Sequence, residues 1–143
     1  MYITGKCHCG NIAFSLDWPD DASGIPARAC DCSFCVKHGG VWTSNSRATL
    51  LATVDDAALV SKYAFGTKTA DFHVCSRCGT VPFATCEIDG RLYAVVNVNT
   101  FENADPSRLL KSASSLQGED VESRLERRKR NWIPDVRITD RSA

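Results

Sequence analysis

Residues 72–80 read Phe72-His73-Val74-Cys75-Ser76-Arg77-Cys78-Gly79-Thr80, and residues 7–9, near the start of the chain, read Cys7-His8-Cys9. A Cys-x-x-Cys pair followed by glycine curls tightly enough for both sulfurs to reach one metal ion, since glycine permits the backbone conformation of such a turn. In an extended segment, Cys7 and Cys9 point to the same side. The two pairs together supply the four thiolates of a closed tetrahedral zinc site. We therefore predict a structural zinc that fastens the N-terminal segment to a later hairpin and contributes folding energy.

A second cluster, Cys30-Asp31-Cys32-Ser33-Phe34-Cys35, places three cysteines within six residues. Three local thiolates can hold one side of a zinc ion and leave its fourth position vacant, as catalytic zinc requires. The eighth cysteine, Cys86, lies in an apolar segment and is compatible with a buried free thiol. Two alternatives to this open site remain. In the first, Cys86 completes a second four-sulfur structural site. In the second, Cys32 and Cys35 form a redox pair.

The composition indicates that the cysteines are metal ligands rather than disulfide partners. It also favours a cytoplasmic location. Eight cysteines in 143 residues stay below the ~8–10% that marks a disulfide scaffold. Residues 1–10 show no secretory signal, and no window approaches the ~18 apolar residues of a membrane span. Lysine plus arginine and aspartate plus glutamate both number 17, so we expect neither a nucleic acid nor a membrane as partner.

The first 100 residues contain short apolar or alternating runs separated by turn residues, and we expect one domain over residues 1–143 with a mainly β core over residues 1–100. Asp89-Gly90 predicts a type I′ hairpin. Meanders and hairpins favour antiparallel sheets and make parallel ones improbable. Two loop-rich breaks, at 17–24 and 103–106, are expected to be connections within the domain. The expected strands are 11–16, 25–32, 41–46, 50–54, 59–65, 70–74, 81–88 and 92–98.

A C-terminal helix is expected over residues 116–131, because acidic residues come early and basic residues late, as the helix macrodipole favours. Leu116, Val121 and Leu125 form a narrow apolar stripe in this segment. Pro134 ends the helix. The four basic residues 127–130 are interpreted as a solvated helix end.

Three ordered motifs, Gly5–Gly10, Cys30–Cys35 and Phe72–Thr80, resemble those of the glutathione-dependent formaldehyde-activating enzyme family, also called the centromere-protein-V-like family. The resemblance covers residues 3 to about 100 and implies an Mss4-like fold, a zinc-braced tent of antiparallel sheets. It implies two Zn²⁺ per chain, one structural and one catalytic. By the family pattern, the structural zinc is held by Cys7, Cys9, Cys75 and Cys78, and the catalytic zinc by Cys30, Cys32 and Cys35.

The family reaction joins glutathione to formaldehyde, giving S-hydroxymethylglutathione, and is classed as a carbon–sulfur lyase reaction when written in reverse. An open zinc position suits this chemistry, since zinc favours the nucleophilic thiolate form of a bound thiol. We expect a small-molecule thiol such as glutathione and a small aldehyde as partners, with His38 assisting proton transfer and Trp42 and Gly39-Gly40 forming the pocket wall. Alternative functions are a non-catalytic zinc-braced binding module of the same fold and a thiol redox protein.

Three further residues carry expectations. His73 is interpreted as a hydrogen-bonded strand residue. Arg28 is among the cations, with Lys37 and Arg77, that would balance the net negative charge of zinc–thiolate sites. The charged helix and the tail at 132–138 lie outside the resemblance.

Overall fold

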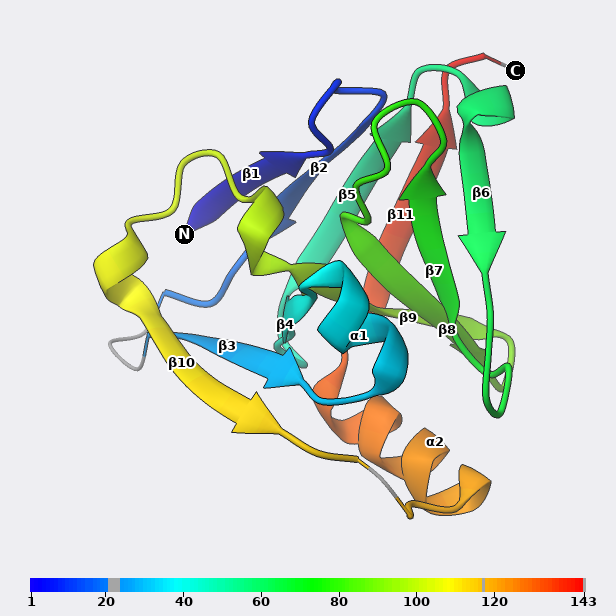
Figure 1. Ribbon diagram of the computed structural model, residues 1–143. Helices are drawn as coiled ribbons and strands as arrows, with labels where there is room; N and C mark the ends of the chain where they lie inside the picture. Colours follow the sequence, from blue (N-terminus) through cyan, green and yellow to red (C-terminus); the bar gives the residue numbers. More distant parts are fainter. Residues whose placement is uncertain (21–23, 117, 143) are drawn as a thin grey trace.

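The computed structural model describes residues 1–20, 24–116 and 118–142. Its strands form a four-stranded sheet in the order β1-β2-β5-β11 and a seven-stranded sheet in the order β10-β3-β4-β9-β8-β7-β6 (Figure 1). The expected mainly β fold with a C-terminal helix is confirmed. Within the described ranges, no helix is both long and apolar enough to cross a membrane. The expected break at 17–24 includes residues 21–23, which lie outside the described part of the chain.

The four-stranded sheet follows the alternation of apolar and polar residues in its central strands. In β2 (Ile12–Asp17) the residues Ile12, Phe14 and Leu16 are buried, while the residues between them are partly exposed. Its neighbours β1 (Tyr2–Lys6) and β5 (Thr49–Val54) pair with it antiparallel. This alternation turns one face of the sheet toward the core.

Two strands of the seven-stranded sheet end in a clustered cysteine, Cys30 in β3 and Cys75 in β7. Asp89 and Gly90 connect two of the strands with φ angles of 52° and 78°, which confirms the expected type I′ turn. The bounds are β3 (Ile25–Cys30), β4 (Val41–Thr43), β6 (Val60–Tyr63), β7 (Asp71–Cys75), β8 (Phe83–Ile88), β9 (Arg91–Asn97) and β10 (Leu109–Ser114), with 3-10 turns at Ala57–Leu59, Val98–Thr100 and Pro106–Arg108.

Two strand pairs are parallel, so the expectation of purely antiparallel sheets was wrong. β10 pairs parallel with β3, and β11 (Asp135–Asp140) pairs parallel with β5. Both β10 and β11 are edge strands with mostly exposed side chains. The sequence of β10 has no period-two apolar pattern, whereas in β11 Val136 and Ile138 alternate with polar residues.

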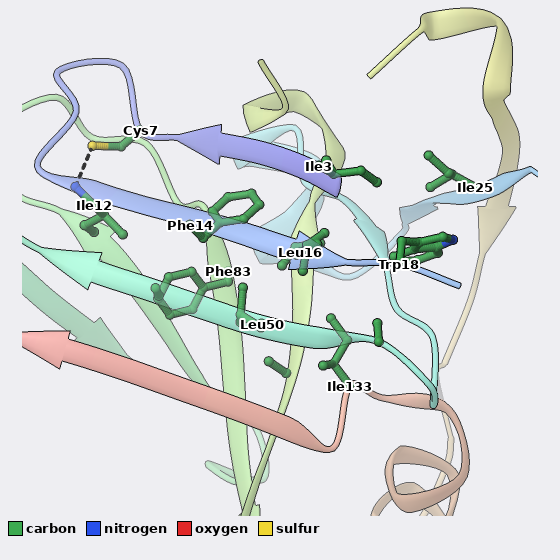
Figure 2. Close-up of a cluster of buried hydrophobic side chains, with 14 of the residues drawn as sticks. Ile3, Cys7, Ile12, Phe14, Leu16, Trp18, Ile25, Leu50, Phe83 and Ile133 are labelled. Atoms are coloured by element: carbon green, nitrogen blue, oxygen red, sulfur yellow. Dashed lines mark hydrogen bonds between the residues drawn. The ribbon is translucent and has the colours of Figure 1, made fainter. Parts of the chain in front are cut away.

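The main core lies beside the four-stranded sheet and includes side chains from both sheets (Figure 2). Phe14 and Leu16 of β2, Leu50 of β5, Phe83 of β8 and Ile133 beyond the C-terminal helix belong to it. Strands β8 and β9 are buried on both faces, because alternate residues such as Ala84 and Val95 belong to a second apolar cluster. The second cluster lies against the helices and borders the three-cysteine segment.

Two α-helices complete the fold. The short helix α1 (Ser33–His38) was not expected, since its six residues are too few for an amphipathic pattern. Helix α2 (Val121–Asn131) begins at Val121 rather than at 116, because the side chain of Asp120 caps it by accepting a hydrogen bond from the Ser123 N–H at 2.7 Å. Residue 117, inside the expected helix, lies outside the described residues.

Candidate metal centres and the adjoining cavity

Four cysteines from two distant segments meet at the end of the two sheets. The Sγ atoms of Cys7, Cys9, Cys75 and Cys78 all lie within 4.8 Å of one another. The Cys7–Cys9 and Cys9–Cys75 sulfur distances are 3.8 Å and 3.5 Å. Tetrahedral zinc at ~2.3 Å from each sulfur requires sulfur separations of about 3.8 Å. This group can hold a metal ion, and its donor set is consistent with zinc.

Two tight turns bring these sulfurs together. The Gly79 N–H donates to the Cys75 carbonyl at 2.7 Å, and the φ of Gly79 is 80°, which agrees with the role expected for this glycine. Residues 7–10 also form a turn, with the Gly10 N–H donating to the Cys7 carbonyl at 3.1 Å. The expected extended conformation at Cys7–Cys9 was therefore wrong, since a turn rather than strand alternation brings the two sulfurs to one side.

Backbone N–H groups and burial shape the chemistry of the four thiols. The Ile12 N–H donates to Cys7 Sγ at 3.3 Å (Figure 2). Burial raises the pKa of Cys7 to about 12. Burial also acts to raise the pKa of Cys78, but hydrogen bonds from the backbone of Thr80 and Cys9 outweigh this effect and lower the pKa to about 5. A divalent cation would release the remaining protons, so metal binding and proton release are linked at this site.

The second cluster is built around the start of α1. The Sγ atoms of Cys30, Cys32 and Cys35 lie within 4.8 Å of one another. Cys32 is the N-cap of α1, and its sulfur accepts a hydrogen bond from the Cys35 N–H at 3.4 Å. The Cys32 N–H donates to Cys30 Sγ at 3.5 Å, and the indole N–H of Trp42 donates to Cys35 Sγ at 3.3 Å. Each sulfur therefore receives an N–H donor, an arrangement that stabilises thiolate ligands.

Hydrogen bonding shifts the pKa values of Cys30 and Cys35 in opposite directions. The hydrogen bond from Cys35 lowers the pKa of Cys30 to about 5. The same contact with Cys30, together with burial, raises the pKa of Cys35. The group can hold a metal ion through three sulfurs.

Cys86 is separate from both groups. It is buried in β8, and its sulfur accepts a hydrogen bond from Arg128 Nη1 at 3.3 Å. Among the described residues, the sulfurs grouped with Cys30 are those of Cys32 and Cys35 alone. The geometry therefore gives no support to Cys86 as a fourth sulfur of this cluster.

A cavity of about 460 Å³ adjoins the three-cysteine cluster but not the four-cysteine cluster. Cys30, Cys32 and Cys35 line it, whereas Cys7 and Cys75 are fully buried and lie away from it. One wall is apolar and consists of Trp42, Phe65, Phe72, Ala84 and Val95. Residues of α2 and the position after it also line the cavity, namely Arg124, Arg127, Arg128, Asn131 and Trp132.

Helix α2 presents an arginine face to this cavity, which corrects two expectations. Arg124, Arg128 and Asn131 follow the i, i+4, i+7 spacing of one helix face. Arg128 is only 7% exposed, so the interpretation of residues 127–130 as a solvated end was wrong for this residue. Val121, expected in an apolar stripe, is 45% exposed, while Leu125 packs against the second apolar cluster. Contacts of Arg128 with Thr69 and Cys86 hold this face of the helix toward the cavity, and a single sequence does not reveal such long-range contacts.

The other expected pocket residues are only partly brought to the cavity. Trp42 and Arg28 line it. His38 packs edge-on against Phe34, with ring centroids 5.3 Å apart, and does not line the cavity, nor do Gly39 and Gly40. The structure therefore gives no support to His38 as the proton-transfer residue, because its side chain does not line the cavity.

His73 is a hydrogen-bonded strand residue, as expected, with its Nε2 2.8 Å from Thr85 Oγ1. Burial, with a smaller effect from Lys62, lowers the pKa of His73 from 6.5 to about 4. Below pH 6.5 the unfolded chain binds a proton here that the folded chain excludes until about pH 4. The free energy of unfolding therefore falls as the pH decreases through this window.

Between pH 7 and pH 4, we expect the free energy of unfolding of the wild type to fall by about 3 kcal/mol more than that of His73→Gln. Urea denaturation at a series of pH values measures both proteins. His73→Gln keeps all the cysteines, so acid release of metal contributes to both curves. Parallel curves for the two proteins would contradict the prediction.

The structure thus defines a mainly β protein with one group of four cysteines outside the cavity and one group of three that lines it. The chain matches the family model of the glutathione-dependent formaldehyde-activating enzyme over residues 2–115 and belongs to that family. This confirms the resemblance found in the motifs and the Mss4-like fold. A crystal structure of a Rhodobacter sphaeroides protein is similar to 73% of this chain and 92% of its own, with 30% sequence identity and a TM-score of 0.51. Helix α2 follows the segment that matches the family.

Proposed function

We propose that this chain is a cytoplasmic, zinc-dependent carbon–sulfur lyase that condenses a thiol such as glutathione with formaldehyde or a related small aldehyde. The observation that carries the proposal is the position of Cys30, Cys32 and Cys35 on the wall of the 460 Å³ cavity, where a small molecule can reach all three. Membership of the glutathione-dependent formaldehyde-activating enzyme family supports the choice of reaction. The eight free cysteines suit a reducing compartment.

The donor sets fit zinc at both positions. Soft sulfur ligands in a group of four suit a closed structural zinc, and a group of three beside a cavity suits a catalytic zinc with one open position. Cys7, Cys9, Cys75 and Cys78 would hold the first, and Cys30, Cys32 and Cys35 the second. The zinc, when bound, supplies the positive charge that favours the thiolate form of a substrate thiol.

The residues of the chain would orient the reactants and exclude water. The Trp42 indole N–H fixes the sulfur of Cys35, and Phe65 and Phe72 keep water away from the reacting thiol. In the reaction a sulfur–carbon bond forms, the carbon–oxygen double bond becomes a single bond, and the thiol proton ends on the new hydroxyl. No oxidant or reductant is required.

Two measurements test this proposal together. Elemental analysis should give about two zincs per chain, as the two donor sets of four and three sulfurs imply. X-ray absorption should then find fewer than four sulfurs per zinc on average. With ¹³C-formaldehyde and glutathione, NMR should show the hydroxymethyl thioether forming faster than in buffer. Four sulfurs at every zinc, or a rate equal to that in buffer, would refute it.

A redox function has one observation in its favour, namely that Cys32 caps α1 while Cys35 lies in the first turn of the same helix. Helix N-termini favour thiolates, and Cys-x-x-Cys pairs at such positions carry out thiol–disulfide exchange. Mass spectrometry of protein equilibrated in glutathione buffers distinguishes the two functions. A Cys32–Cys35 disulfide at cytosolic redox potentials would favour the redox function, and the reduced, zinc-bound form would favour the lyase.

A further inference from the structure

Arg128 is the one buried side chain of the Asp, Glu, Lys and Arg classes among the described residues, with 7% of its surface exposed. Three contacts fix it at the edge of the cavity. Its Nη1 donates to Thr69 Oγ1 at 2.9 Å and to Cys86 Sγ at 3.3 Å. Its guanidinium lies over the ring of Trp132, 4.8 Å from the centroid. The side chain is therefore held in place rather than mobile in solvent.

No carboxylate among the described residues pairs with this cation. Glu119, the acidic residue beside α2, forms its ion pairs with Arg127 at 3.0 Å and with Arg124 at 3.4 Å. The Nε of Arg128 is buried and has no hydrogen-bond partner within the described part of the chain. Buried charges are costly unless they are paired and hydrogen-bonded. An anionic group from outside the chain would supply the missing partner.

The cavity that Arg128 lines carries an excess of positive charge. Four arginines and one aspartate line it, namely Arg28, Arg124, Arg127, Arg128 and Asp31. The same continuous space is lined by the three cysteines, so one molecule can contact both groups. Its volume of about 460 Å³ lies within the ~300–1,000 Å³ of small-molecule sites.

We propose that Arg128 binds a carboxylate of the thiol substrate and so makes this site selective for anionic thiols. The inference rests on the proposed function for the position of the substrate sulfur near Cys30, Cys32 and Cys35. Arg128 lines the cavity, and a guanidinium can donate hydrogen bonds to the two oxygens of a carboxylate, a pairing that is both strong and directional. Thr69, Cys86 and Trp132 act as positioning residues for the guanidinium.

The test uses S-methylglutathione, which keeps both carboxylates of glutathione but has no thiol, and its dimethyl ester, which has no carboxylate. Calorimetric titration of zinc-loaded wild-type protein should detect the acid and find the ester at least about tenfold weaker. Arg128→Gln should lower the affinity for the acid by about tenfold or more without changing the affinity for the ester. The affinity of Arg128→Lys for the acid should lie between those of wild type and Arg128→Gln. Arg130→Gln is the matched control, since Arg130 is exposed on the same helix and does not line the cavity.

Several results would overturn the assignment. Equal affinity of the acid for wild type and Arg128→Gln would do so, as would failure of wild type to bind the acid or to distinguish it from the ester. An equal loss of affinity for the acid and the ester in Arg128→Gln would indicate that Arg128 has a structural role. Loss of zinc from Arg128→Gln would show that the guanidinium serves the cysteine cluster. Because the probe has no thiol, carboxylate-dependent binding without condensation activity would refute the proposed function and leave the role of Arg128 intact.

Discussion

Cys32→Ser is expected to lose one of two zinc equivalents and to slow thiol–aldehyde condensation at least about 100-fold, with little change in the free energy of unfolding. The sulfur of Cys32 lies within 4.8 Å of those of Cys30 and Cys35 and borders the cavity. A serine hydroxyl is a poor zinc ligand at neutral pH, so two thiolates would remain to hold the ion. The N-cap of α1 survives, because serine is itself a preferred capping residue.

Zinc content, circular dichroism and the NMR assay with ¹³C-formaldehyde measure these three effects on one preparation. Cys86→Ser serves as the control for zinc content, since its sulfur contacts Arg128 and not the cysteine groups. We expect it to retain both zincs. If Cys86→Ser lost a zinc equivalent, Cys86 would be a ligand and the open-site hypothesis would fail. Retention of full activity by Cys32→Ser would instead favour a non-catalytic binding module.

Cys78→Ser is expected to lose the other zinc equivalent and to lower the free energy of unfolding by about 4 kcal/mol or more. The four-cysteine group joins the turn after β1 to the turn after β7, segments that are far apart in the sequence. The site forms only in the folded chain, so metal binding there contributes folding free energy directly. Loss of one ligand also leaves Cys7 and Cys75 as fully buried thiols without a metal.

Urea denaturation with and without a chelator measures this effect, and Cys32→Ser is the matched comparison because it makes the same substitution in the other group. The chelator should destabilise wild type strongly and Cys78→Ser little. Equal destabilisation by Cys78→Ser and Cys32→Ser would contradict the division into one structural and one catalytic zinc.

Much of the fold followed from local sequence patterns. The alternation of Ile12, Phe14 and Leu16 identified β2, and Asp89-Gly90 identified the β8–β9 hairpin, because each pattern depends on neighbouring residues alone. The edge strands β10 and β11 were missed. The sequence of β10 has no apolar period, and β11 alternates at only two apolar positions, Val136 and Ile138. Their parallel pairing depends on long-range contacts that no local pattern records.

The grouping of the cysteines was determined by the sequence itself. Thiols two or three residues apart can reach a common metal ion where the chain turns, so the spacing of Cys30, Cys32 and Cys35 predicted one group and the two distant pairs predicted the other. The family resemblance rested on the same spacing. Which group faces a ligand depends on the packing around it. From the sequence, the fourth position of the three-cysteine site could be either Cys86 or vacant.

Tertiary structure alone decided that the three-cysteine group lines a cavity and that α2 contributes to the same lining. The burial of Arg128 depends on the packing of α2 and on the contacts of this side chain with Thr69 and Cys86 from other segments. In sequence, Arg128 lies in a run of basic residues at a helix end, a pattern typical of solvated surfaces. Only the folded chain distinguishes the buried arginine from its exposed neighbour Arg130, because burial is a property of contacts between segments.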